Sequence, residues 1–456
     1  MAAFRHRFTL TIARATSPCE MIKGDKRVIR AWAMYDWANS AYSLTITSAI
    51  FPIYYAAITS VGGTDKVLTQ YGIPAESLQS YTLSVGFLLI AVIAPILSGI
   101  ADHRGNKKSY LKFFCYLGSV SCAGMFFFTY DHLWIGLLLF MMACIGFSGS
   151  LIFYDAFLPE IAEPKDHDRV SARGYAMGYI GSVILLVLNL MMVMKPHWFG
   201  IPDRDGLPAR LSFLSVGIWW AGWAQITFRR LPDARPAKEE AVNVFTIGYN
   251  ELRRVWKEMI GLQRLRRFLT AFFVYNMGVQ TVMYLAVTYA KKEIKDPDGS
   301  AISDAGLIIS ILVIQLVAAL GALLFVRLSK RFGNIPALVI GLVIWMLVCL
   351  AAWRIDSTNE FYVLAAFVGL VMGGTQALSR STYAKLLPET VDHASYFSFY
   401  DVSFYLGTVL GTLAFGLVNQ LTGDLRNTII AIGSFFVVGS ILLWRVPKEG
   451  RLAATS

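Results

Sequence analysis

The chain carries a long succession of apolar segments, and this feature restricts its fold more than any other. A transmembrane helix needs roughly 20 predominantly apolar residues, and about twelve segments reach that length. Backbone groups in lipid must satisfy their hydrogen bonds internally, which favours helices. The sequence therefore predicts an all-α polytopic membrane protein. The predicted spans are residues 30–55, 78–101, 110–130, 133–156, 173–195, 210–230, 267–290, 304–328, 335–354, 360–384, 394–420 and 426–445.

The composition agrees with a membrane protein and argues against a nucleic-acid partner. The chain is 56% hydrophobic and 16% charged, with a mean hydropathy of +0.54, whereas a soluble domain is about 25% charged. The net charge is +11, but most of the basic residues fall in loops on one side of the predicted membrane, and there is no separate basic domain. We predict a multi-pass protein of a bacterial-type inner (plasma) membrane with both termini in the cytoplasm.

Cysteine, histidine and motif content gives no indication of a cofactor, a metal site or catalysis. The five cysteines form no C-x-x-C pair and most lie in apolar spans, and the six histidines are scattered; neither set has the spacing of metal ligands. The sequence has no Walker-type loop, no H-E-x-x-H and no G-x-S-x-G. We therefore predict no enzyme activity, no cofactor and no metal.

The longest connection divides the chain near its middle. It contains an apolar helical face made by Phe245, Tyr249, Leu252, Trp256 and Met259. Two interpretations stay open for this run: a helix on an anionic membrane surface, or a helix that covers the cytoplasmic end of the bundle. The predicted divisions are an N-terminal cytoplasmic arm (1–29), a six-helix half (30–230), a linker (231–266), a second six-helix half (267–446) and a cytoplasmic tail (447–456).

The first residues need a separate interpretation. Residues 1–29 lack the apolar core of a secretory signal, although their Arg-rich, acid-poor start faintly resembles an organellar presequence. We favour Met21 as the start of translation. N-terminal sequencing of native protein that begins upstream of Met21 contradicts this expectation.

Short motifs occur twice in the same order and at nearly one offset. Y-x-x-x-L-P-E recurs, and so do three weaker pairs. This pattern predicts two halves related as parallel repeats, which in transporters hold a substrate at their interface near the midplane of the membrane. The pairs are residues 154–160 with 383–389, 178–181 with 404–407, 105–106 with 333–334, and 35–36 with 275–276.

The first span has a polar face that a lipid-exposed helix does not need. Its members recur with helical spacing: Asp36, Asn39, Ser40, Ser43 and Thr47. A carboxylate inside the membrane is costly and indicates function, so we interpret this span as a pathway-lining helix with Asp36 as the first candidate for proton coupling. The alternative is that Asp36 only caps or pairs structurally near the cytoplasmic end of the helix.

The second half supplies further candidates, each with a structural alternative. Asp401 is the counterpart acid, or it is a carboxylate hydrogen-bonded to a neighbouring helix near the cytoplasmic face. Arg380 has the planar fork that binds a substrate carboxylate, or it neutralises Asp401 or Asp155. Amides such as Asn276 bind polar solutes but also join helices. The predicted substrate-binding or coupling residues are Tyr35, Asp36, Asn39, Ser43, Asn276, Gln280, Gln376, Arg380, Tyr383, Asp401 and Tyr405.

A charged turn after the second span predicts a cytoplasmic gate. Its acid, Asp102, is placed to cap a neighbouring helix N-terminus and to pair with basic residues when the cytoplasmic side is closed. For Lys107 and Lys108, solvated charges that enforce topology are an open alternative. The predicted gate residues are Asp102, Arg104, Gly105, Glu160 and Glu389.

Two levels of resemblance follow from these motifs. The two halves and the turn G-I-A-D-H-R-G, residues 99–105, resemble the major facilitator superfamily, although His103 directly follows the acid and the second copy, residues 328–333, has lost the acid. W-A-M-Y-D-W-A-N-S-A-Y, Y-D-A-F-L-P-E-I, S-A-R-G-Y-A-M-G-Y and G-G-T-Q-A-L-S-R-S resemble the vacuole-effluxer family, whose fungal members export amino acids from vacuoles. The resemblance implies solute export or uptake.

We therefore expect a monomeric secondary transporter that moves a small polar solute, such as an amino acid, by alternating access, with proton coupling and with membrane lipid around it. An exporter of lipid or drug-like amphiphiles is one alternative, although the polar faces favour a hydrophilic solute. A transporter-like sensor that moves nothing is the other. Flux into proteoliposomes separates the three.

Overall fold

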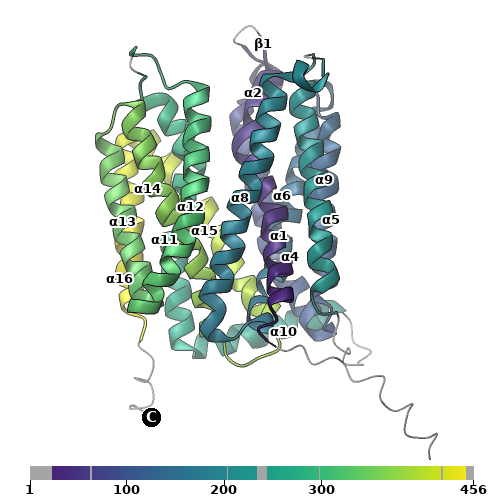
Figure 1. Ribbon diagram of the computed structural model, residues 1–456, viewed down its shortest axis with the longest axis vertical. Helices are drawn as coiled ribbons and strands as arrows, with labels where there is room; N and C mark the ends of the chain where they lie inside the picture. Colours follow the sequence, from purple (N-terminus) through teal and green to yellow (C-terminus); the bar gives the residue numbers. More distant parts are fainter. Residues whose placement is uncertain are drawn as a thin grey trace, which may run out of the picture.

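The computed structural model describes residues 23–447, except 62–63, 203, 234–243, 297 and 423–424. Met21, most of the predicted arm, the tail beyond residue 447 and the middle of the predicted linker lie outside the described residues. The described chain forms two groups of long helices that stand side by side (Figure 1).

The first group contains the elements drawn from purple to teal in Figure 1. Its elements are α1 (Lys26–Ala41), η1 (Tyr42–Ile50), α2 (Phe51–Thr59), β1 (Ser60–Val61), β2 (Thr64–Asp65), α3 (Lys66–Tyr71), α4 (Ala75–Arg104), α5 (Lys107–Gly124), η2 (Met125–Phe127), η3 (Tyr130–His132), α6 (Leu133–Asp155), α7 (Leu158–Ile161), η4 (Pro164–Asp166), α8 (His167–Met194), η5 (Pro196–Phe199) and α9 (Leu207–Arg230). The strands β1 and β2 pair antiparallel.

In the described part of the connection between the two groups lies the helix α10 (Val244–Gly261). The second group, green to yellow in Figure 1, contains α11 (Gln263–Glu293), α12 (Asp304–Phe332), α13 (Asn334–Arg354), α14 (Thr358–Leu386), α15 (His393–Thr422) and α16 (Leu425–Trp444).

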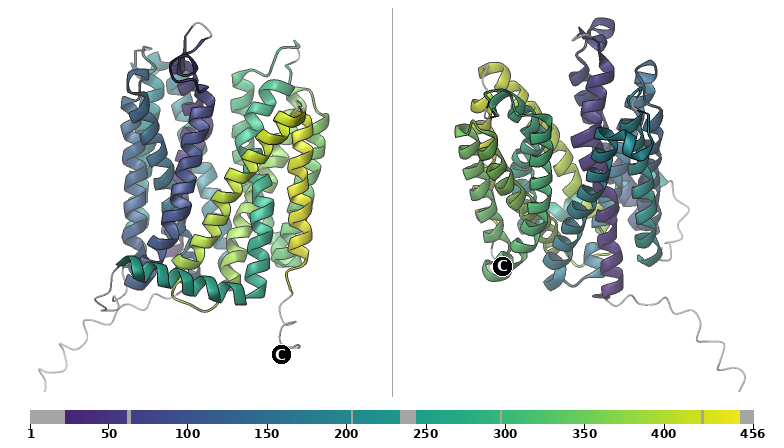
Figure 2. Two further views of the ribbon diagram at one scale, coloured as in Figure 1. Left: turned by 180° about the vertical axis from the view of Figure 1, so that it is seen from behind. Right: turned by 45° about the horizontal axis from the view of Figure 1, so that its top comes forward.

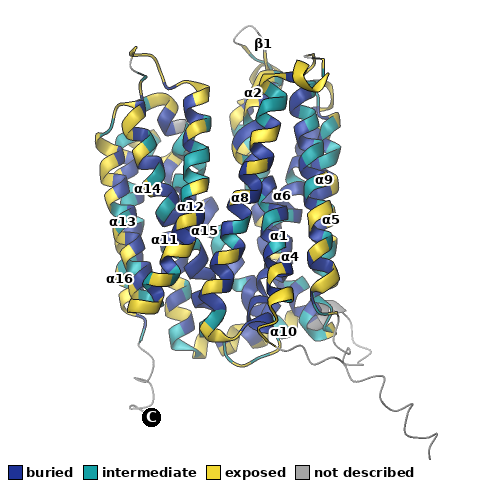
Figure 3. Ribbon diagram, in the orientation of Figure 1, coloured by how far each residue is buried: buried dark blue, intermediate teal, exposed yellow. Residues whose placement is uncertain are grey.

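The predicted fold class is confirmed. Among the described residues, ten helical segments are long and apolar enough to cross a membrane, the first being the continuous run Lys26–Thr59. The helices α9 and α11 are not among these ten segments and run alongside them (Figure 1). Large apolar side chains are exposed, for example Val92, Leu320 and Leu413, and Figure 3 shows exposed stretches along many of the long helices. Such a surface suits contact with acyl chains rather than water.

Both groups use small residues to bring matching helices together. In the first group α1 packs against α8, and a Cβ atom at Gly178 would lie 2.4 Å from Ser40 Oγ. In the second group α11 packs against α15, and a Cβ atom at Gly411 would lie 2.4 Å from Thr281 Oγ1. Close backbone approach at glycine is the usual way to join helices in lipid. The repeat inferred from the sequence is thus visible as a repeated helix pairing.

The first span contains a π-helical stretch, η1, that the predicted α-helical spacing does not include. In this stretch Ser48 Oγ donates to the carbonyl of Ser43, five residues back, at 3.0 Å. A π-helix turns more slowly per residue than an α-helix, and such stretches are frequent at functional sites. The polar face therefore changes register after residue 41 and comes to include Ser48.

The helix α10 lies across one end of the two groups, which we call the base (Figure 2). The beginning of α1 and the end of α16 lie at the same end (Figure 1). Val255 and Met259 are buried against the bundle, whereas Tyr249 and Trp256 are exposed. The helix covers the base, as one of the two interpretations expects, and it also presents aromatic side chains outward; the membrane-surface interpretation stays a prediction for that outer face. The side chain of Phe245 lies outside the described residues.

Candidate functional site

A cavity of ≈ 190 Å³ lies between the two groups of helices. Polar groups from both halves face it, because α1 and η1 present one polar stripe and α11, α14 and α15 present others. The predicted residues that line it are Asp36, Asn39, Ser43, Gln280, Gln376, Arg380, Asp401 and Tyr405.

The cavity is closed toward the base and opens at the other end. Along the first span, Asp36 is only 5% exposed, Ser43 is half-buried and Ser48, farthest from the base, is exposed. All three line the same cavity. A solute therefore reaches the charged floor near Asp36 from the end opposite α10.

Arg380 on α14 forms the floor of the cavity and connects the two halves. Its Nη1 donates to Asp155 Oδ1 at 2.9 Å and its Nη2 donates to Asp36 Oδ2 at 3.2 Å. It also donates to the side chain and the carbonyl of Ser171 on α8, at 2.9 and 3.0 Å. Since the guanidinium is 1% exposed, the pairs it makes are desolvated and strongly directional.

Aromatic rings enclose this ion cluster. The guanidinium lies 4.2 Å from the ring centroid of Tyr175 and 4.9 Å from that of Trp32. Trp32 stacks on Tyr154, whose hydroxyl donates to Asp36 Oδ2 at 2.8 Å. Of the two roles expected for Arg380, the structure shows the ion pair: its donors are directed to protein groups, and its partners are Asp36 and Asp155 rather than Asp401.

Asp401 on α15 also lines the cavity but has no such partner. It is 4% exposed, and its Oδ2 accepts no hydrogen bond from the described residues. The amide nitrogen of Asn39 on α1, which lines the same cavity, is likewise buried without an acceptor. Buried polar groups are normally satisfied, so these two atoms indicate positions that a ligand or water fills.

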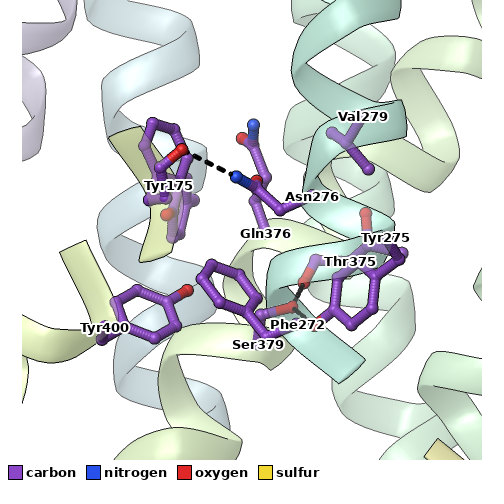
Figure 4. Close-up of a pocket in the computed structure, with 10 residues that line it drawn as sticks. Tyr175, Phe272, Tyr275, Asn276, Val279, Thr375, Gln376, Ser379 and Tyr400 are labelled. Atoms are coloured by element: carbon purple, nitrogen blue, oxygen red, sulfur yellow. Dashed lines mark hydrogen bonds between the residues drawn. The ribbon is translucent and has the colours of Figure 1, made fainter. Parts of the chain in front are cut away.

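Asn276 lies in a smaller pocket of ≈ 10 Å³ beside the main cavity (Figure 4). Its Nδ2 donates to the carbonyl of Phe404 at 3.1 Å, and its Oδ1 accepts from Gln280 at 3.2 Å. Next to it, Tyr275 and Ser379 share a hydrogen bond of 2.7 Å. A volume of this size admits about one water molecule. Asn276 therefore joins α11 to α15, and Gln280 is the member of the pair that reaches the main cavity.

The structure places Tyr35 and Tyr383 away from the cavity. Tyr35 is next to Asp36 in sequence and so points about 100° around the helix, into the first group, where its ring lies 5.0 Å from that of Tyr154. Tyr383 donates to the carbonyl of Tyr396 at 2.6 Å and packs against Phe397. Both are fully buried packing residues.

At the base, Asp102 caps the helix α15 of the other half. Its carboxylate accepts hydrogen bonds from the backbone N–H groups of Ser395 at 2.7 Å and Ala394 at 3.3 Å. A carboxylate at a helix N-terminus is stabilised by the unpaired N–H groups and the helix dipole. Gly105 ends α4 with a φ of 66°, a left-handed conformation that glycine adopts readily.

The remaining predicted gate residues divide into two kinds. Glu160 pairs with Lys107 and accepts from His393 Nδ1 at 3.2 Å, so it joins the halves. Arg104 and Glu389 are exposed and make no hydrogen bond or ion pair within the part of the chain that the structure describes. Lys108 is buried and donates to the carbonyl of Leu231 at 2.8 Å, so the expectation of a solvated charge is wrong for this residue.

A second base contact was not predicted. Asp168 on α8 accepts from Lys385 at 2.7 Å, from Asn334 at 2.8 Å and from Ser329 at 2.9 Å. Its three partners all belong to the second group. The sequence offered one signal, an acid in the first turn of an apolar span, but gave no means of finding the partners.

Within the cavity floor, sequence reasoning missed Tyr154, Ser171 and Tyr175 and named Asp155 only as one alternative partner of Arg380. The signal was the recurring motif at residues 154–160, whose Y-D start carries an acid inside an apolar helix.

Comparison with known sequences identifies a family. Residues 24–454 match the profile of the family described as vacuole effluxer Atg22 like. The chain is 32% identical over 430 residues to an uncharacterized MFS-type transporter, YxiO, of Bacillus subtilis, covering 94% of this chain and 97% of the relative. It is 25% identical over 450 residues to autophagy-related protein 22-1 of Phaeosphaeria nodorum, covering 83% and 77%.

Solved structures show the same fold. The fucose:proton symporter FucP of E. coli gives a TM-score of 0.67 at 13% identity, over 93% of this chain and 98% of that chain. The human organic anion transporter MFSD10 gives 0.69 at 14% identity, over 92% and 100%. A bacterial homologue of ferroportin in the outward-facing state gives 0.62 at 14% identity, over 92% and 98%.

Proposed function

Because the chain belongs to the Atg22-like vacuole effluxer family of the major facilitator superfamily, we propose that it is a secondary active transporter that moves a small polar solute, of the amino-acid class, by alternating access with proton coupling. Membership in a family of transporters supports transport itself. The solute class and the coupling ion are our proposal, and we argue them from the cavity.

The observation that carries the proposal is the ion cluster at the cavity floor. Arg380 belongs to the second half, and both carboxylates that it binds belong to the first. Opening the base requires the halves to separate there, which breaks these pairs in a buried setting. Removing one partner of a buried pair is strongly unfavourable. A state with an open base therefore needs another way to neutralise the charges.

A proton supplies that neutralisation. When Asp36 takes up a proton, its attraction to Arg380 falls and the base separates at a lower cost in free energy. The end of the cavity opposite the base gives Asp36 a path to solvent, because the polar stripe from Ser43 to Ser48 continues to the exposed mouth. Proton uptake and solute exchange are then linked through one contact between the halves, as alternating access requires.

The polar lining favours a hydrophilic solute over a lipid or a drug-like amphiphile. Asn39, Ser43 and Gln376 offer neutral hydrogen-bonding groups to the cavity. A hydrophilic solute can pair with these groups, whereas an amphiphile would leave them without partners, and pairing of buried polar groups decides specificity.

Uptake of labelled amino acids into proteoliposomes tests the proposal. We expect a pH difference across the membrane to drive accumulation above that in vesicles without a gradient. Asp36→Asn should remove the effect of the gradient, and Asp233→Asn, at an exposed residue outside the cavity, should retain it. Normal gradient-driven transport by Asp36→Asn contradicts the coupling role of Asp36. Absence of uptake for every amino acid contradicts the solute class.

A further inference from the structure

The charges that line the main cavity do not balance. Asp36, Asp155 and Asp401 face it, and Arg380 is the one basic side chain among its described lining residues. When all three carboxylates are ionised, the lining therefore carries a net charge of −2. A buried region with such an excess attracts a compensating cation.

The unbalanced charge is concentrated at Asp401. Arg380 donates to Asp36 and to Asp155, so these two carboxylates have a partner. Asp401 is as deeply buried as they are, yet its Oδ2 accepts no hydrogen bond from the described residues. A buried carboxylate is paired, binds a cation or takes up a proton, and no hydrogen bond from the described residues pairs Asp401 Oδ2.

The walls next to Asp401 are aromatic. Tyr175, Tyr400, Phe404 and Tyr405 line the cavity, and Tyr175 and Tyr400 also face the adjoining small pocket in Figure 4. The ring of Tyr175 already lies 4.2 Å from the guanidinium of Arg380. Aromatic faces attract cations, most strongly where water is excluded, so an acid beside such rings suits an ammonium group.

We propose that the carboxylate of Asp401 binds the protonated amino group of the transported solute. This inference rests on the proposed transport function and specifies which charged group of the solute the cavity recognises. Recognition of a solute carboxylate by Arg380 is disfavoured, because the guanidinium is directed to Asp36, Asp155 and Ser171. The unpartnered amide nitrogen of Asn39 is a donor for an oxygen of the solute.

The first test measures the sign of the potential in the cavity. A cysteine is placed at Ser43, on the cavity wall, and another at Ser80, an exposed position on α4 outside it. Each is labelled with a trimethylammonium-ethyl and with a sulfonato-ethyl methanethiosulfonate, and mass spectrometry of the peptide with the new cysteine gives the rates. We expect the cation-to-anion rate ratio at Ser43→Cys to exceed that at Ser80→Cys by about tenfold.

The same ratio is then measured after Asp401→Asn, which removes the charge, and after Asp401→Glu, which retains it. The excess of the cation-to-anion rate ratio at Ser43→Cys over that at Ser80→Cys should fall several-fold in Asp401→Asn and persist in Asp401→Glu. Equal ratios at Ser43→Cys and Ser80→Cys overturn the inference, and so does an excess that Asp401→Asn leaves unchanged. Thermal melting of each variant verifies that it is folded before labelling.

The second test separates an amine from other sources of positive charge. The probes are 3-methylbutylammonium and 4-methylpentanoate, which each keep one of the two charged groups of leucine on a branched carbon chain. The ammonium probe should slow labelling of Ser43→Cys by the neutral reagent methyl methanethiosulfonate, and this protection should disappear in Asp401→Asn. Equal effects of the two probes, including no effect of either, overturn the assignment of an amine.

Neither test requires turnover, so two failures can be distinguished. A protein that accumulates an amino acid but shows no preference for the ammonium probe keeps the proposed function and refutes the role of Asp401. A protein that the ammonium probe protects through Asp401, but that moves no solute under any gradient, supports the binding site and refutes the proposed transport.

Discussion

The two halves of the molecule share a scaffold but differ in what the scaffold carries. The motif Y-x-x-x-L-P-E lies at the end of α6 in the first half and at the end of α14 in the second. In the first copy Tyr154 donates to Asp36 and is followed by Asp155. In the second copy Tyr383 donates to a backbone carbonyl and is followed by Ala384. The repeat therefore preserves the position of the tyrosine and not its role.

The same contrast appears at the base. The glycines that end α4 and α12, Gly105 and Gly333, both have positive φ values, 66° and 86°. However, the acids Asp102 and Asp168 both come from the first half, and the groups that bind them come from the second. The comparison teaches that repeated sequence builds the helices, and that complementary charge on the two copies makes the halves bind to each other across the interface.

The largest loss of stability should come from removing the charge of Arg380, which pairs with both Asp36 and Asp155. Arg380→Met leaves Asp36 and Asp155 buried without it, which should lower the free energy of unfolding by about 3–5 kcal/mol. Thermal melting in detergent measures the loss, and Arg380→Lys, which retains a charge, should lose less. Adding Asp155→Asn to Arg380→Met should restore part of the stability.

A wild-type melting temperature for Arg380→Met contradicts the view that the halves are joined by complementary charge. So does a double variant that is less stable than Arg380→Met alone, because the removed carboxylate would then be stabilising without its cation.

A smaller loss of stability should distinguish two equivalent glycines, one in each half, at which helices pack closely. A Cβ atom at Gly181 would lie 2.8 Å from the carbonyl oxygen of Trp37, whereas the corresponding atom at Gly407 would lie 3.2 Å from Asn276 Nδ2 and 3.3 Å from the carbonyl oxygen of Phe273. The backbone contact is therefore about half an ångström closer at Gly181. Gly181→Ala should therefore cost about 1–3 kcal/mol of stability, as overpacking does, and Gly407→Ala less. Equal melting temperatures would show that both helix pairs are equally tight.

The smallest change in stability is expected for a charge pair in which one partner is exposed to water. Asp233, whose side chain is 91% exposed, pairs with Lys108 at 2.7 Å. The hydrogen bond from Lys108 lowers the pKa of Asp233. The pair thus stabilises the folded state above the ordinary pKa of about 4 and loses this contribution as the pH falls below it.

Because Asp233 is open to water, although Lys108 is buried, the contribution is at most about 0.5–1 kcal/mol. Asp233→Asn should therefore melt within a few degrees of the wild type at pH 7, and the difference should shrink as the pH falls through the lowered pKa of Asp233. A large fall in the melting temperature of Asp233→Asn at pH 7 would indicate that the start of the linker contributes more to stability than the charges between the halves.

Much of the fold was predictable because its signals are local. The length of the apolar runs fixes the helices, and each predicted span overlaps an observed helix, for example 173–195 with α8. The motif pairs indicated the repeat. The polar stripe predicted for the first span lines the cavity at Asp36, Asn39 and Ser43. The π-helical turn was not predictable from the spacing, because the assumed 3.6-residue period fails within η1.

The sequence by itself determined that this protein is a bundle of membrane-spanning helices with polar faces, since hydrophobicity and its period are properties of short segments. Only the tertiary structure decided that Arg380 binds Asp155, 225 positions away, that Asp401 Oδ2 accepts no hydrogen bond from the described residues, and that Tyr35 and Tyr383 face away from the cavity. The physical reason is that an ion pair depends on how separate helices pack, and no pattern along one helix specifies which acid its neighbour will present.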